Sequence, residues 1–404
     1  MSRTDRPPPA CDIAVAGGGI LGLATARELA LREPEARICL LEAEPRLAAH
    51  QSSHNSGVVH AGVYYAPGSL RARLCVEGAA SLKEYCIERG LPWRQSGKLI
   101  VASDARGLPR LDELERRANL NGVPGIARLG PDEIVEVEPE ARGLAGLHSP
   151  ATAVTDFAAV AASFADDLEA SGGSIHVGAG VTGASDAGTG GVRISTTGGT
   201  VICERAVFCA GLQSDRLARS MGGSPEPVIV PVRGGYLKVR AGRENLVRGN
   251  VYPVPDPELP FLGAHLTRTF DGSLLIGPTA MIVASRNAYR LTAVDRRDLG
   301  GTVRWPGTWK LMRRHWRSTV NEAANSIRPS RLVLEAARMV PALTWADVEP
   351  GPAGVRAQAL DREGMLIEDF LIENLGNTTH VRNAPSPAAT SSLALASLIA
   401  DQVL

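Results

Sequence analysis

Residues 50–75 combine several groups that can exchange protons. They read HQSSHNSGVVHAGVYYAPGSLRARLC, so three histidines, an asparagine, several serines and two tyrosines stand in a stretch interrupted by glycines. Polar side chains mixed with the apolar pair Val58-Val59 suit the lining of a partly buried cavity better than a surface loop in water. The segment therefore predicts a site of chemistry, and a structural glycine-rich connector is the alternative.

A nucleotide-binding pattern precedes this segment. The apolar run of residues 13–16 leads into the sequence GGGILG, and residues 23–31 then carry apolar side chains at helical spacing. In such a motif Gly17 permits the tight turn, Gly19 lets the backbone approach a pyrophosphate, and Gly22 allows close packing of helix on strand. The N-terminus of the helix adds partial positive charge for the phosphates. The motif predicts a dinucleotide site, against the alternative of a βαβ unit with incidental glycines.

The second strand of this unit supports the same reading. The strand of residues 37–41 is apolar after Arg37 and ends at Glu42, which lies 20 residues after Gly22. An acid at this place binds the ribose diol of a dinucleotide. A carboxylate rather than an arginine disfavours the additional 2′-phosphate of NADP.

Three further places offer contacts to the same cofactor. In the first segment these candidates are His54, Asn55 and Ser56; after the apolar strand of residues 205–209 they are Ala210 and Gly211; before the last helix they are Ser386 and Ala388. Ser386 is predicted as the N-cap of that helix, with Pro387 at its first position, so that free N–H groups face the cofactor. A plain strand-to-loop turn and a merely structural helix are the alternatives.

Composition favours a large soluble enzyme. The 404 residues exceed the size at which a single core stops growing, so two closely joined domains are expected. The 43 basic and 43 acidic residues cancel, which leaves no basic field to attract nucleic acid. Six cysteines without a C-x-x-C pair indicate a reduced, cytoplasmic protein. No apolar run reaches the roughly 20 residues of a membrane span, so any membrane contact is expected to be peripheral.

The chain is expected to leave the nucleotide-binding domain and return to it twice. We predict a disordered tail over residues 1–10, a nucleotide-binding domain from residues 11–80, 151–225 and 336–404, and a substrate domain from residues 81–150 and 226–335. Helical patterns cover residues 76–89, 111–120, 157–170 and 308–318. Successive strands between residues 229 and 277, including one over residues 261–267, predict an antiparallel sheet above the site. The fold class is α/β, a Rossmann-like βαβ domain with an interleaved antiparallel-sheet domain.

Seven stretches of the chain resemble the L-2-hydroxyglutarate dehydrogenase/oxidase family, part of the FAD-dependent D-amino-acid-oxidase-like superfamily. They are GGGILG, HQSSHNSGVVHAGVYYAPGSLRARLC, GKLIVA, PVRGGYLKV, VYPVPDPELPFLGAHLTR, GPAGVRAQALDREG and HVRNAPSPAATSS. The resemblance runs from about Asp12 to Val403. It implies non-covalent FAD, the two-domain fold of that superfamily, oxidation of L-2-hydroxyglutarate to 2-oxoglutarate, and electron transfer to a quinone or to oxygen. The chain departs from the family pattern at Ala43, Ser53, Thr279, Ser285 and Ala323, which leaves the exact acid open.

Such an oxidation needs a hydride acceptor over C2, a base for the hydroxyl proton, and cations for the carboxylates. Histidine is the natural base near neutral pH, and the candidates are His265, which we favour, and His60 beside the flavin. Arginine pairs in bidentate fashion with planar carboxylates. The leading substrate ligands are therefore Arg233, Arg356 and Arg382, followed by Lys98 and Tyr252. Each of these side chains has a purely structural role as its alternative.

Two other functions stay open at this point. An amine or amino-acid oxidase on the same fold would retain FAD and oxidise a C–N bond instead. A non-catalytic FAD-binding protein is the third reading, although it would not need so many histidines and arginines above the flavin. The sequence contains no metal-ligand pattern and no G-x-S-x-G nucleophile motif.

Overall fold

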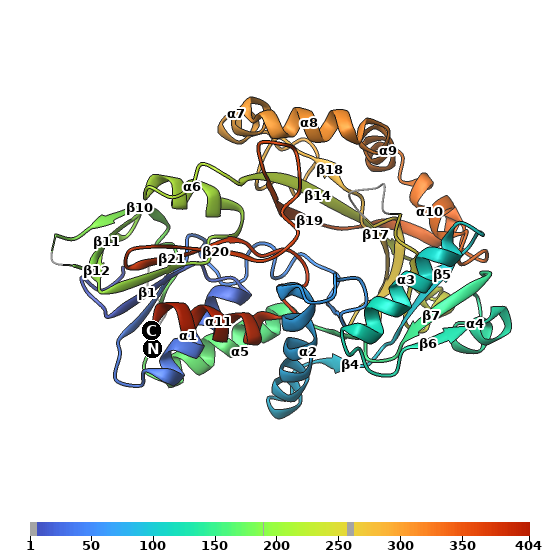
Figure 1. The fold of residues 1–404 in the computed structure, drawn as a ribbon, viewed down its shortest axis with the longest axis horizontal. Coiled ribbons are helices and arrows are strands. Elements are labelled where there is room, and N and C mark those ends of the chain that lie inside the picture. Colours follow the sequence, from blue (N-terminus) through green and yellow to red (C-terminus); the bar gives the residue numbers. More distant parts are fainter. Residues whose placement is uncertain (1–5, 189, 257–261) are drawn as a thin grey trace.

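The chain builds two large β-sheets that it visits in turn. The computed structural model describes residues 6–188, 190–256 and 262–404. In Figure 1 the half that contains β1 and α1 lies on the left and the second large sheet on the right, with long strands running between them. The chain crosses from one half to the other several times, which confirms the interleaved arrangement expected from the sequence.

The first sheet has six strands in the order β20-β21-β13-β1-β2-β9. Its strands are β1 (Ile13–Ala16), β2 (Ile38–Leu41), β9 (Ser174–His176), β13 (Arg205–Phe208), β20 (Leu371–Leu375) and β21 (Thr378–Asn383). Strand β1 pairs in parallel with both β2 and β13, and β20 closes one edge in antiparallel fashion. All four residues of β1 are buried, as expected for a strand that is covered on both faces.

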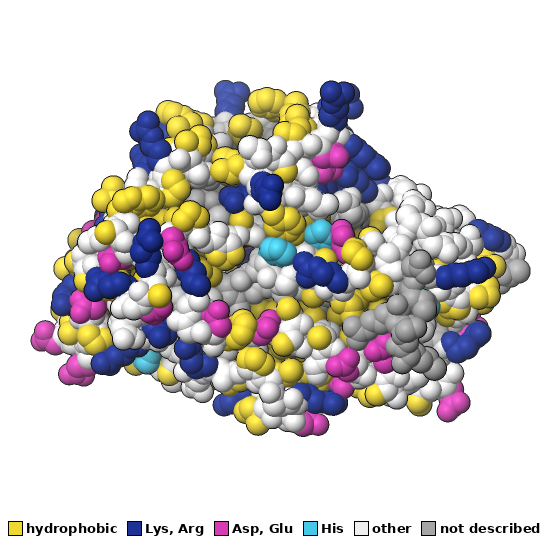
Figure 2. Space-filling view, turned by 180° about the vertical axis from the view of Figure 1, so that it is seen from behind, with side chains coloured by type: hydrophobic (Ala, Val, Ile, Leu, Met, Phe, Trp, Pro, Cys, Tyr) yellow, Lys and Arg dark blue, Asp and Glu magenta, His cyan; other side chains and the backbone are white. Residues whose placement is uncertain are grey.

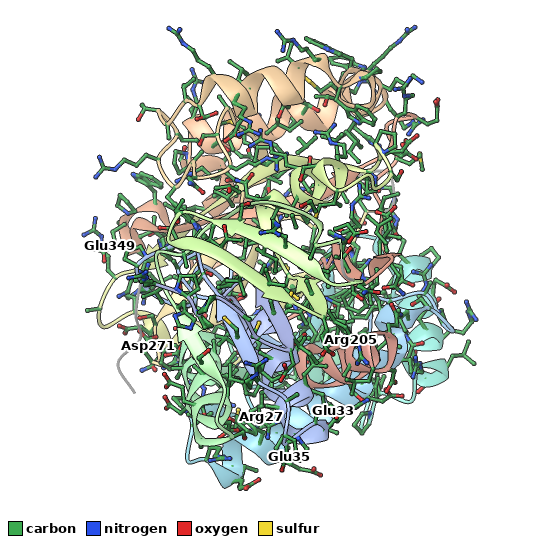
Figure 3. The ribbon with its side chains drawn as sticks, turned by 90° about the vertical axis from the view of Figure 1, so that its left-hand side faces the viewer. Arg27, Glu33, Glu35, Arg205, Asp271 and Glu349 are labelled. Atoms are coloured by element: carbon green, nitrogen blue, oxygen red, sulfur yellow. The ribbon has the colours of Figure 1, made fainter. Side chains whose placement is uncertain are left out.

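Three helices cover one face of this sheet, and a small sheet covers the other. The helices are α1 (Ile20–Arg32), α5 (Phe157–Ala170) and α11 (Ser392–Val403); the small sheet consists of β10 (Val181–Asp186), β11 (Val192–Thr196) and β12 (Gly199–Cys203). Ile13 and Val15 pack into the core under the helices, whereas Ala14 and Ala16 face the core under the small sheet. Figure 3 views the molecule from this side, with Arg27 on α1 and Glu33 and Glu35 just beyond its end. The Arg27 guanidinium pairs with Asp167 of α5 at 2.7 Å and so joins the two helices.

The second sheet has nine strands and supports the opposite half. Its strands are β5 (Lys98–Ala102), β6 (Ala127–Leu129), β7 (Ala145–Ser149), β14 (Val228–Val239), β15 (Asn250–Pro253), β16 (His265–Arg268), β17 (Leu274–Gly277), β18 (Met281–Ile282) and β19 (Val348–Leu360). Nearly all of its pairings are antiparallel, with β15 on β5 the parallel exception. Helices α3 (Gly107–Leu120), α4 (Pro131–Val137) and α10 (Ser330–Ala336) contribute to its cores.

The remaining elements connect these halves. They are α2 (Leu70–Glu88), α6 (Ser214–Ser220), α7 (Arg296–Arg304), α8 (Pro306–Arg314), α9 (Trp316–Ile327), the strands β3 (Val58–Val59), β4 (Trp93–Arg94) and β8 (Ala153–Thr155) of a third small sheet, and three short 3-10 turns. Helices α7 to α9 lie along the top of the molecule in Figure 1, above β14 and β18. The long antiparallel pair β14 and β19 runs beneath them.

The structure corrects several predicted element boundaries. Helices α2 and α3 each begin before the predicted residue, and Ser69 caps α2 by accepting a hydrogen bond from the Ala72 amide. The helix predicted over residues 308–318 is two helices that break at His315. The strand predicted over residues 261–267 begins at His265, and its first predicted residue lies outside the described part of the chain. The strands on either side of Gly235 are one continuous strand, β14.

The predicted domain boundaries remain predictions, and two elements cross them. Helix α2 spans the boundary placed after residue 80. Strand β19 lies within the range assigned to the nucleotide-binding domain, yet it pairs with β14 of the second sheet. The second sheet therefore includes a strand from the C-terminal part of the chain.

Candidate active site

The glycine-rich turn after β1 requires glycine at two positions. Gly17 has a φ of 114°, and a Cβ there would lie 2.3 Å from the Cys209 carbonyl oxygen. A Cβ on Gly22 would lie 1.9 Å from the carbonyl oxygen of Gly17. Both distances are far shorter than a van der Waals contact, so these glycines allow the turn and the close approach of α1 to the sheet.

Gly19 differs from its neighbours because the space beside it is open. A Cβ at this position would meet only the Ser52 hydroxyl oxygen, at 3.3 Å. Helix α1 begins at the next residue, and the Ile20 amide donates to that same hydroxyl at 2.9 Å. A pyrophosphate binds where no side chain obstructs the backbone at a helix N-terminus.

Glu42 stands at the end of β2 beside this turn. Its side chain is nearly buried, and its two oxygens accept hydrogen bonds from the amides of Gly18 and Glu44. The carboxylate is therefore fixed where a ribose diol would be bound in a dinucleotide site of this type. Together, the turn, the helix terminus and this acid fit a dinucleotide cofactor.

Polar side chains of the loop after Glu42 form hydrogen bonds within the loop itself and so stabilise its conformation. The Asn55 side-chain amide donates to the carbonyls of Gln51 and Ser52, and its oxygen accepts from the Gly57 amide. The His54 Nδ1 donates to the His50 carbonyl at 2.9 Å, while its ring lies 4.3 Å from that of Tyr289. The roles of His54 and Asn55 toward the cofactor remain predictions.

This braced loop packs directly on strand β19. A Cβ on Gly354 would lie 2.3 Å from the His54 carbonyl oxygen, so only glycine admits the loop here. Two residues further along β19 is Arg356. On the loop side, Ser56 contributes hydrogen bonding to the hydroxyl of Tyr236 from β14. The predicted cofactor loop is thus adjacent to the predicted substrate strands.

Ala210 and Gly211 follow β13 at the same edge of the first sheet. The Cys209 amide donates to the Ala16 carbonyl, which places the end of β13 beside the glycine-rich turn. Gly211 has a φ of 50° and begins a short 3-10 turn. These positions suit a backbone that passes beside a nucleotide, and that role remains a prediction.

Ser386 is not the N-cap of the last helix. Helix α11 begins at Ser392, because the preceding residues form turns in which Ala388 donates to the Pro385 carbonyl and Ser391 to that of Pro387. The Ser386 hydroxyl instead lies 3.3 Å from the His60 Nε2. This loop therefore approaches the catalytic candidates directly, and its contacts to a cofactor stay predictions.

Lys98, Tyr252 and His265 form a compact buried cluster on three strands of the second sheet. The side chains are 2%, 2% and 7% exposed. The Lys98 Nζ lies 4.4 Å from the ring centroid of Tyr252, which in turn stacks on the His265 ring at 4.0 Å. No ion pair joins Lys98 to any described carboxylate, and burial lowers its pKa to about 7. An anionic ligand beside this buried amine would favour its charged form, so Lys98 suits the binding of an anion.

His265 has the hydrogen-bonding pattern of a general base. Its Nδ1 lies 2.9 Å from the Gly263 carbonyl, which can only accept, so Nδ1 carries the proton and Nε2 keeps its lone pair. Burial lowers the pKa of His265 to about 3, and the charges of Lys98 and Arg356 contribute to this lowering. The imidazole is consequently neutral across the physiological range.

His60 lies close enough to be influenced by the same charges. Burial lowers the pKa of His60 well below its ordinary value, with smaller contributions from Lys98, His265 and Arg71. Its amide donates to the Thr390 hydroxyl, and its Nδ1 has no described hydrogen-bond partner. His60 therefore joins the cluster to the loop that holds Ser386.

Arg356 approaches the cluster from β19, and Arg233 stands on the antiparallel partner strand β14. Arg356 pairs in register with Val232, and its guanidinium lies close to Gly234 and influences Tyr236, Tyr252 and His265. Arg233 donates to the Tyr289 carbonyl, and burial lowers its pKa. Neither arginine forms an ion pair with a described carboxylate, so both remain candidate ligands for the substrate.

Arg382 is the one substrate candidate that the structure places in a structural role. Its guanidinium pairs with Glu373 of the neighbouring strand β20 and donates to the carbonyls of Ser224 and Pro227. The side chain is 1% exposed, and these partners already compensate its charge. The expectation that Arg382 binds a substrate carboxylate is therefore wrong.

Sequence reasoning missed two tyrosines of the cluster. Tyr64 has its ring 5.0 Å from the Lys98 Nζ, and burial raises its pKa well above the ordinary value. Tyr236 is likewise protonated, because burial raises its pKa, while Arg356 and Ser56 oppose this rise. Both tyrosines occur in stretches that carry the family resemblance, but no separate signal distinguishes them from their neighbours in the sequence.

The residue before Tyr64 is Val63, which is buried in an apolar cluster together with Tyr252. A tyrosine that follows a buried valine is typical of an ordinary core segment. The sequence pattern around Tyr64 is therefore that of a core residue. Tyr64 is identified as part of the site only in the structure, where the Lys98 Nζ lies beside the Tyr64 ring.

The space-filling view places histidines near the middle of one face of the molecule. Figure 2 shows two histidine side chains close together there, with lysine and arginine side chains beside them.

Among the described residues, no group of three or more His, Cys, Asp or Glu side chains is placed to hold a metal ion. No described helix is long and apolar enough to cross a membrane. The side chains described at the site carry imidazole, phenol, amine and guanidinium groups.

Comparison with known proteins gives concordant matches over the whole chain. The model of the FAD dependent oxidoreductase family matches residues 12–402. The mitochondrial L-2-hydroxyglutarate dehydrogenase of Nematostella vectensis is 43% identical over 99% of this chain and 91% of that protein. The corresponding protein of Homo sapiens is 43% identical over 98% and 92%, and the L-2-hydroxyglutarate dehydrogenase of Indibacter alkaliphilus is 38% identical over 97% and 98%.

Solved structures show the same fold at lower sequence identity. The L-alpha-glycerophosphate oxidase of Mycoplasma pneumoniae, with FAD bound, superposes with a TM-score of 0.78 at 23% identity, over 98% of this chain and 94% of that chain. Glycine oxidase of Geobacillus kaustophilus gives a TM-score of 0.73 at 21% identity, over 98% and 95%. These matches confirm the D-amino-acid-oxidase-like fold class predicted from the sequence.

Proposed function

We propose that this chain, which belongs to the FAD dependent oxidoreductase family and within it to the L-2-hydroxyglutarate dehydrogenases, oxidises L-2-hydroxyglutarate to 2-oxoglutarate. The observation that carries the proposal is a neutral, buried His265 flanked by Lys98 and Arg356, two cations without described ion-pair partners. Such a site suits an anionic substrate that must lose a proton.

FAD is the cofactor of the family, and the residues of the glycine-rich turn fit it. Gly17, Gly19 and Gly22 would accommodate the pyrophosphate, and Glu42 would bind the adenosine ribose. When bound, FAD supplies the hydride acceptor of the reaction. We assign the remaining contacts to the loops that carry Ser56, Ala210, Gly211 and Ala388, with His54 and Asn55 bracing their own loop.

The protein side chains would accept the proton and bind the carboxylates of the substrate. The His265 Nε2 would accept the proton of the C2 hydroxyl, while Tyr252 holds the imidazole plane by stacking at 4.0 Å. Lys98 and Arg356 would each bind a carboxylate of the substrate, and Arg233 would support the second anion site. Burial is the main cause of the low pKa of His265, and Lys98 and Arg356 add to it. The negative charge of the substrate would offset the contribution of these two cations and would so make the imidazole a stronger base.

Replacing Gly19 by leucine should abolish FAD retention and leave a folded protein. The side chain would occupy the open space beside the turn, where only Ser52 lies nearby. The purified variant should be colourless, with the circular dichroism spectrum of the wild type. Gly22→Leu serves as the contrasting variant, because its Cβ would collide with the Gly17 carbonyl and should prevent folding. A yellow Gly19→Leu protein with stoichiometric FAD would refute the assignment of the turn.

L-2-Hydroxyglutarate should bleach the flavin under anaerobic conditions, whereas D-2-hydroxyglutarate and L-lactate should do so poorly. Two fixed cations and one base define three points of attachment, which select one enantiomer and require the distal carboxylate. Stopped-flow absorbance of the flavin measures the reduction directly. Equal rates with both enantiomers, or faster bleaching by an amino acid, would contradict the proposed substrate and favour an amino-acid oxidase.

The electron acceptor is part of the proposal. We infer that a quinone accepts the electrons from the reduced cofactor and that oxygen accepts them more slowly. The cytoplasmic location with peripheral membrane contact, expected from the sequence, stays a prediction.

A further inference from the structure

Residues 285–289, between β18 and α7, contact two loops that we assign to FAD. The first is the loop of residues 43–57 after β2, and the second is the turn of residues 210–213 after β13. The Ser285 carbonyl accepts from the Ala288 amide at 3.2 Å, so the five residues themselves form a compact turn. They follow β18, which pairs with β14 of the second sheet. We call residues 285–289 the strap, because they reach from the second sheet to both loops.

Arg286 joins the strap to the turn after β13. Its side chain is 4% exposed, and its guanidinium donates to the Leu212 carbonyl and to both carboxylate oxygens of Asp215, the latter at 2.6 and 2.8 Å. Leu212 directly follows Gly211, and Asp215 lies in α6 just beyond the turn. The Arg286 amide also donates to Asp298 of α7 at 2.7 Å. This residue therefore fixes the position of the turn from the side of the second sheet.

Tyr289 joins the strap to the loop after β2. Its hydroxyl lies 2.9 Å from the His50 Nδ1, and its ring centroid lies 4.3 Å from that of His54. The His50 Nε2 lies 2.9 Å from a Glu44 carboxylate oxygen, which can only accept, so Nε2 carries a proton and Nδ1 faces Tyr289. The Tyr289 carbonyl accepts from the Arg233 Nε at 3.2 Å. The tyrosine is thus held both by the loop and by β14.

The two loops leave the first sheet at the edge where a dinucleotide binds. They follow β2 and β13, the parallel neighbours of β1, and the glycine-rich turn follows β1 itself. Ligands of such sheets lie outside the carboxyl ends of the strands, so FAD held by the glycine-rich turn would lie between these loops. Because the strap contacts both loops, their separation would break the contacts of Arg286 or Tyr289.

We propose that the strap retains FAD, with Arg286 and Tyr289 as positioning residues that hold the two loops together and slow the release of the cofactor. Affinity differences between closely related complexes arise mostly in the dissociation rate. Loss of a strap contact should therefore speed release more than it slows binding. The proposal rests on the assignment of FAD to these loops, and it concerns the cofactor rather than the oxidation reaction.

The test measures FAD release from the holoprotein in the absence of substrate. The holoprotein is diluted to a concentration too low for rebinding, and free FAD is followed by ultrafiltration and flavin fluorescence. Tyr289→Phe, which removes only the hydroxyl that contacts His50, should release FAD about five- to tenfold faster than the wild type. Arg286→Lys keeps the charge but loses the bidentate contact with Asp215, and should release FAD about 30-fold faster.

Two control variants remove equivalent contacts on other elements. Tyr85→Phe removes a hydroxyl of α2 that contacts Ser163 and Asp167 of α5. Arg382→Lys changes a buried arginine of β21 that pairs with Glu373. Both controls should lower the thermal unfolding midpoint of the apoprotein, as the strap variants do. They should nevertheless release FAD at the wild-type rate.

A double variant tests whether Tyr289 acts through His50. His50→Leu alone should also speed FAD release. Combined with Tyr289→Phe, it should give less than the product of the two single effects, because both changes remove the same hydrogen bond. A double variant that shows the full product would overturn the role assigned to this contact.

Wild-type release rates from both Tyr289→Phe and Arg286→Lys would overturn the proposal. Equal acceleration in the two control variants would also overturn it, since general destabilisation would then explain the effect. If Arg286→Lys does not fold, Tyr289→Phe decides the question, because the loss of one oxygen atom keeps the ring in place. A holoprotein that releases FAD as expected but is not bleached by L-2-hydroxyglutarate would contradict the proposed reaction and support the strap.

Discussion

His265→Gln should slow reduction of the flavin by L-2-hydroxyglutarate about 10²- to 10⁴-fold while FAD stays bound. Glutamine approximates the size of the imidazole and can still donate toward the Gly263 carbonyl, but it offers no nitrogen lone pair to accept the hydroxyl proton. The loss should therefore appear in the limiting rate of flavin bleaching at saturating substrate. Rapid mixing of the anaerobic holoprotein with substrate over a range of concentrations measures that rate.

His60→Gln is the matched comparison for this experiment. His60 is influenced by the same charges as His265, but its Nε2 faces the Ser386 hydroxyl rather than an open position. Its replacement should change the limiting rate less than that of His265. A His265→Gln protein that bleaches at nearly the wild-type rate would show that His265 is not the base and would assign this role to His60.

The parts of the fold that the sequence predicts are those that local sterics decide. Gly17 has a backbone conformation that side chains rarely allow, and Gly22 leaves no room for a Cβ, so their spacing is already specific in the sequence. Burial of all four residues of β1 likewise follows from an uninterrupted apolar run. The nucleotide-binding turn, its strand and its helix are accordingly predicted with the right residues.

Tertiary contacts decide the features that the sequence predicts wrongly. Arg382 stands in a polar motif like a ligand, but its partner Glu373 is set by the pairing of β20 with β21. The helix expected over residues 308–318 breaks at His315, where Arg314 binds the Gly364 carbonyl while α9 is anchored at Ala280. The contacts with Glu373, Gly364 and Ala280 cannot be predicted from the spacing of apolar residues in the sequence.

The residues of the site come from segments that are distant from one another in the sequence. Lys98 and His265 both stand out as polar residues in apolar strands, and the sequence identifies them separately. Their contact through Tyr252 depends on the pairing of β15 with β5 and with β16. The sequence therefore predicts the members of the cluster better than their geometry, and the order of strands supplies the rest.

The same cluster predicts a pH dependence that distinguishes its two cations. Burial lowers the pKa of Lys98 to about 7, so the ammonium of the free enzyme is present below this pH and is lost as the pH rises through it. Wild-type kcat/KM for L-2-hydroxyglutarate, which reports the free enzyme, should therefore fall as the pH rises above about 7. Saturating substrate should shift this fall in the limiting rate to higher pH, because a bound carboxylate favours the charged lysine.

Lys98→Met and Arg356→Met should separate the two anion sites. Each removes the protein's cation from a buried pair with the substrate and should raise the half-saturating substrate concentration about 10²-fold or more. Lys98→Met should also abolish the fall in kcat/KM near pH 7, whereas Arg356→Met should retain it, because the guanidinium stays charged throughout this range and Lys98 is still present. Steady-state rates with a dye acceptor, measured from about two pH units below this value to about two above it, provide the profiles. A Lys98→Met profile that still falls near pH 7 would show that another group titrates there. An unchanged half-saturating concentration in this variant would show that Lys98 binds no carboxylate.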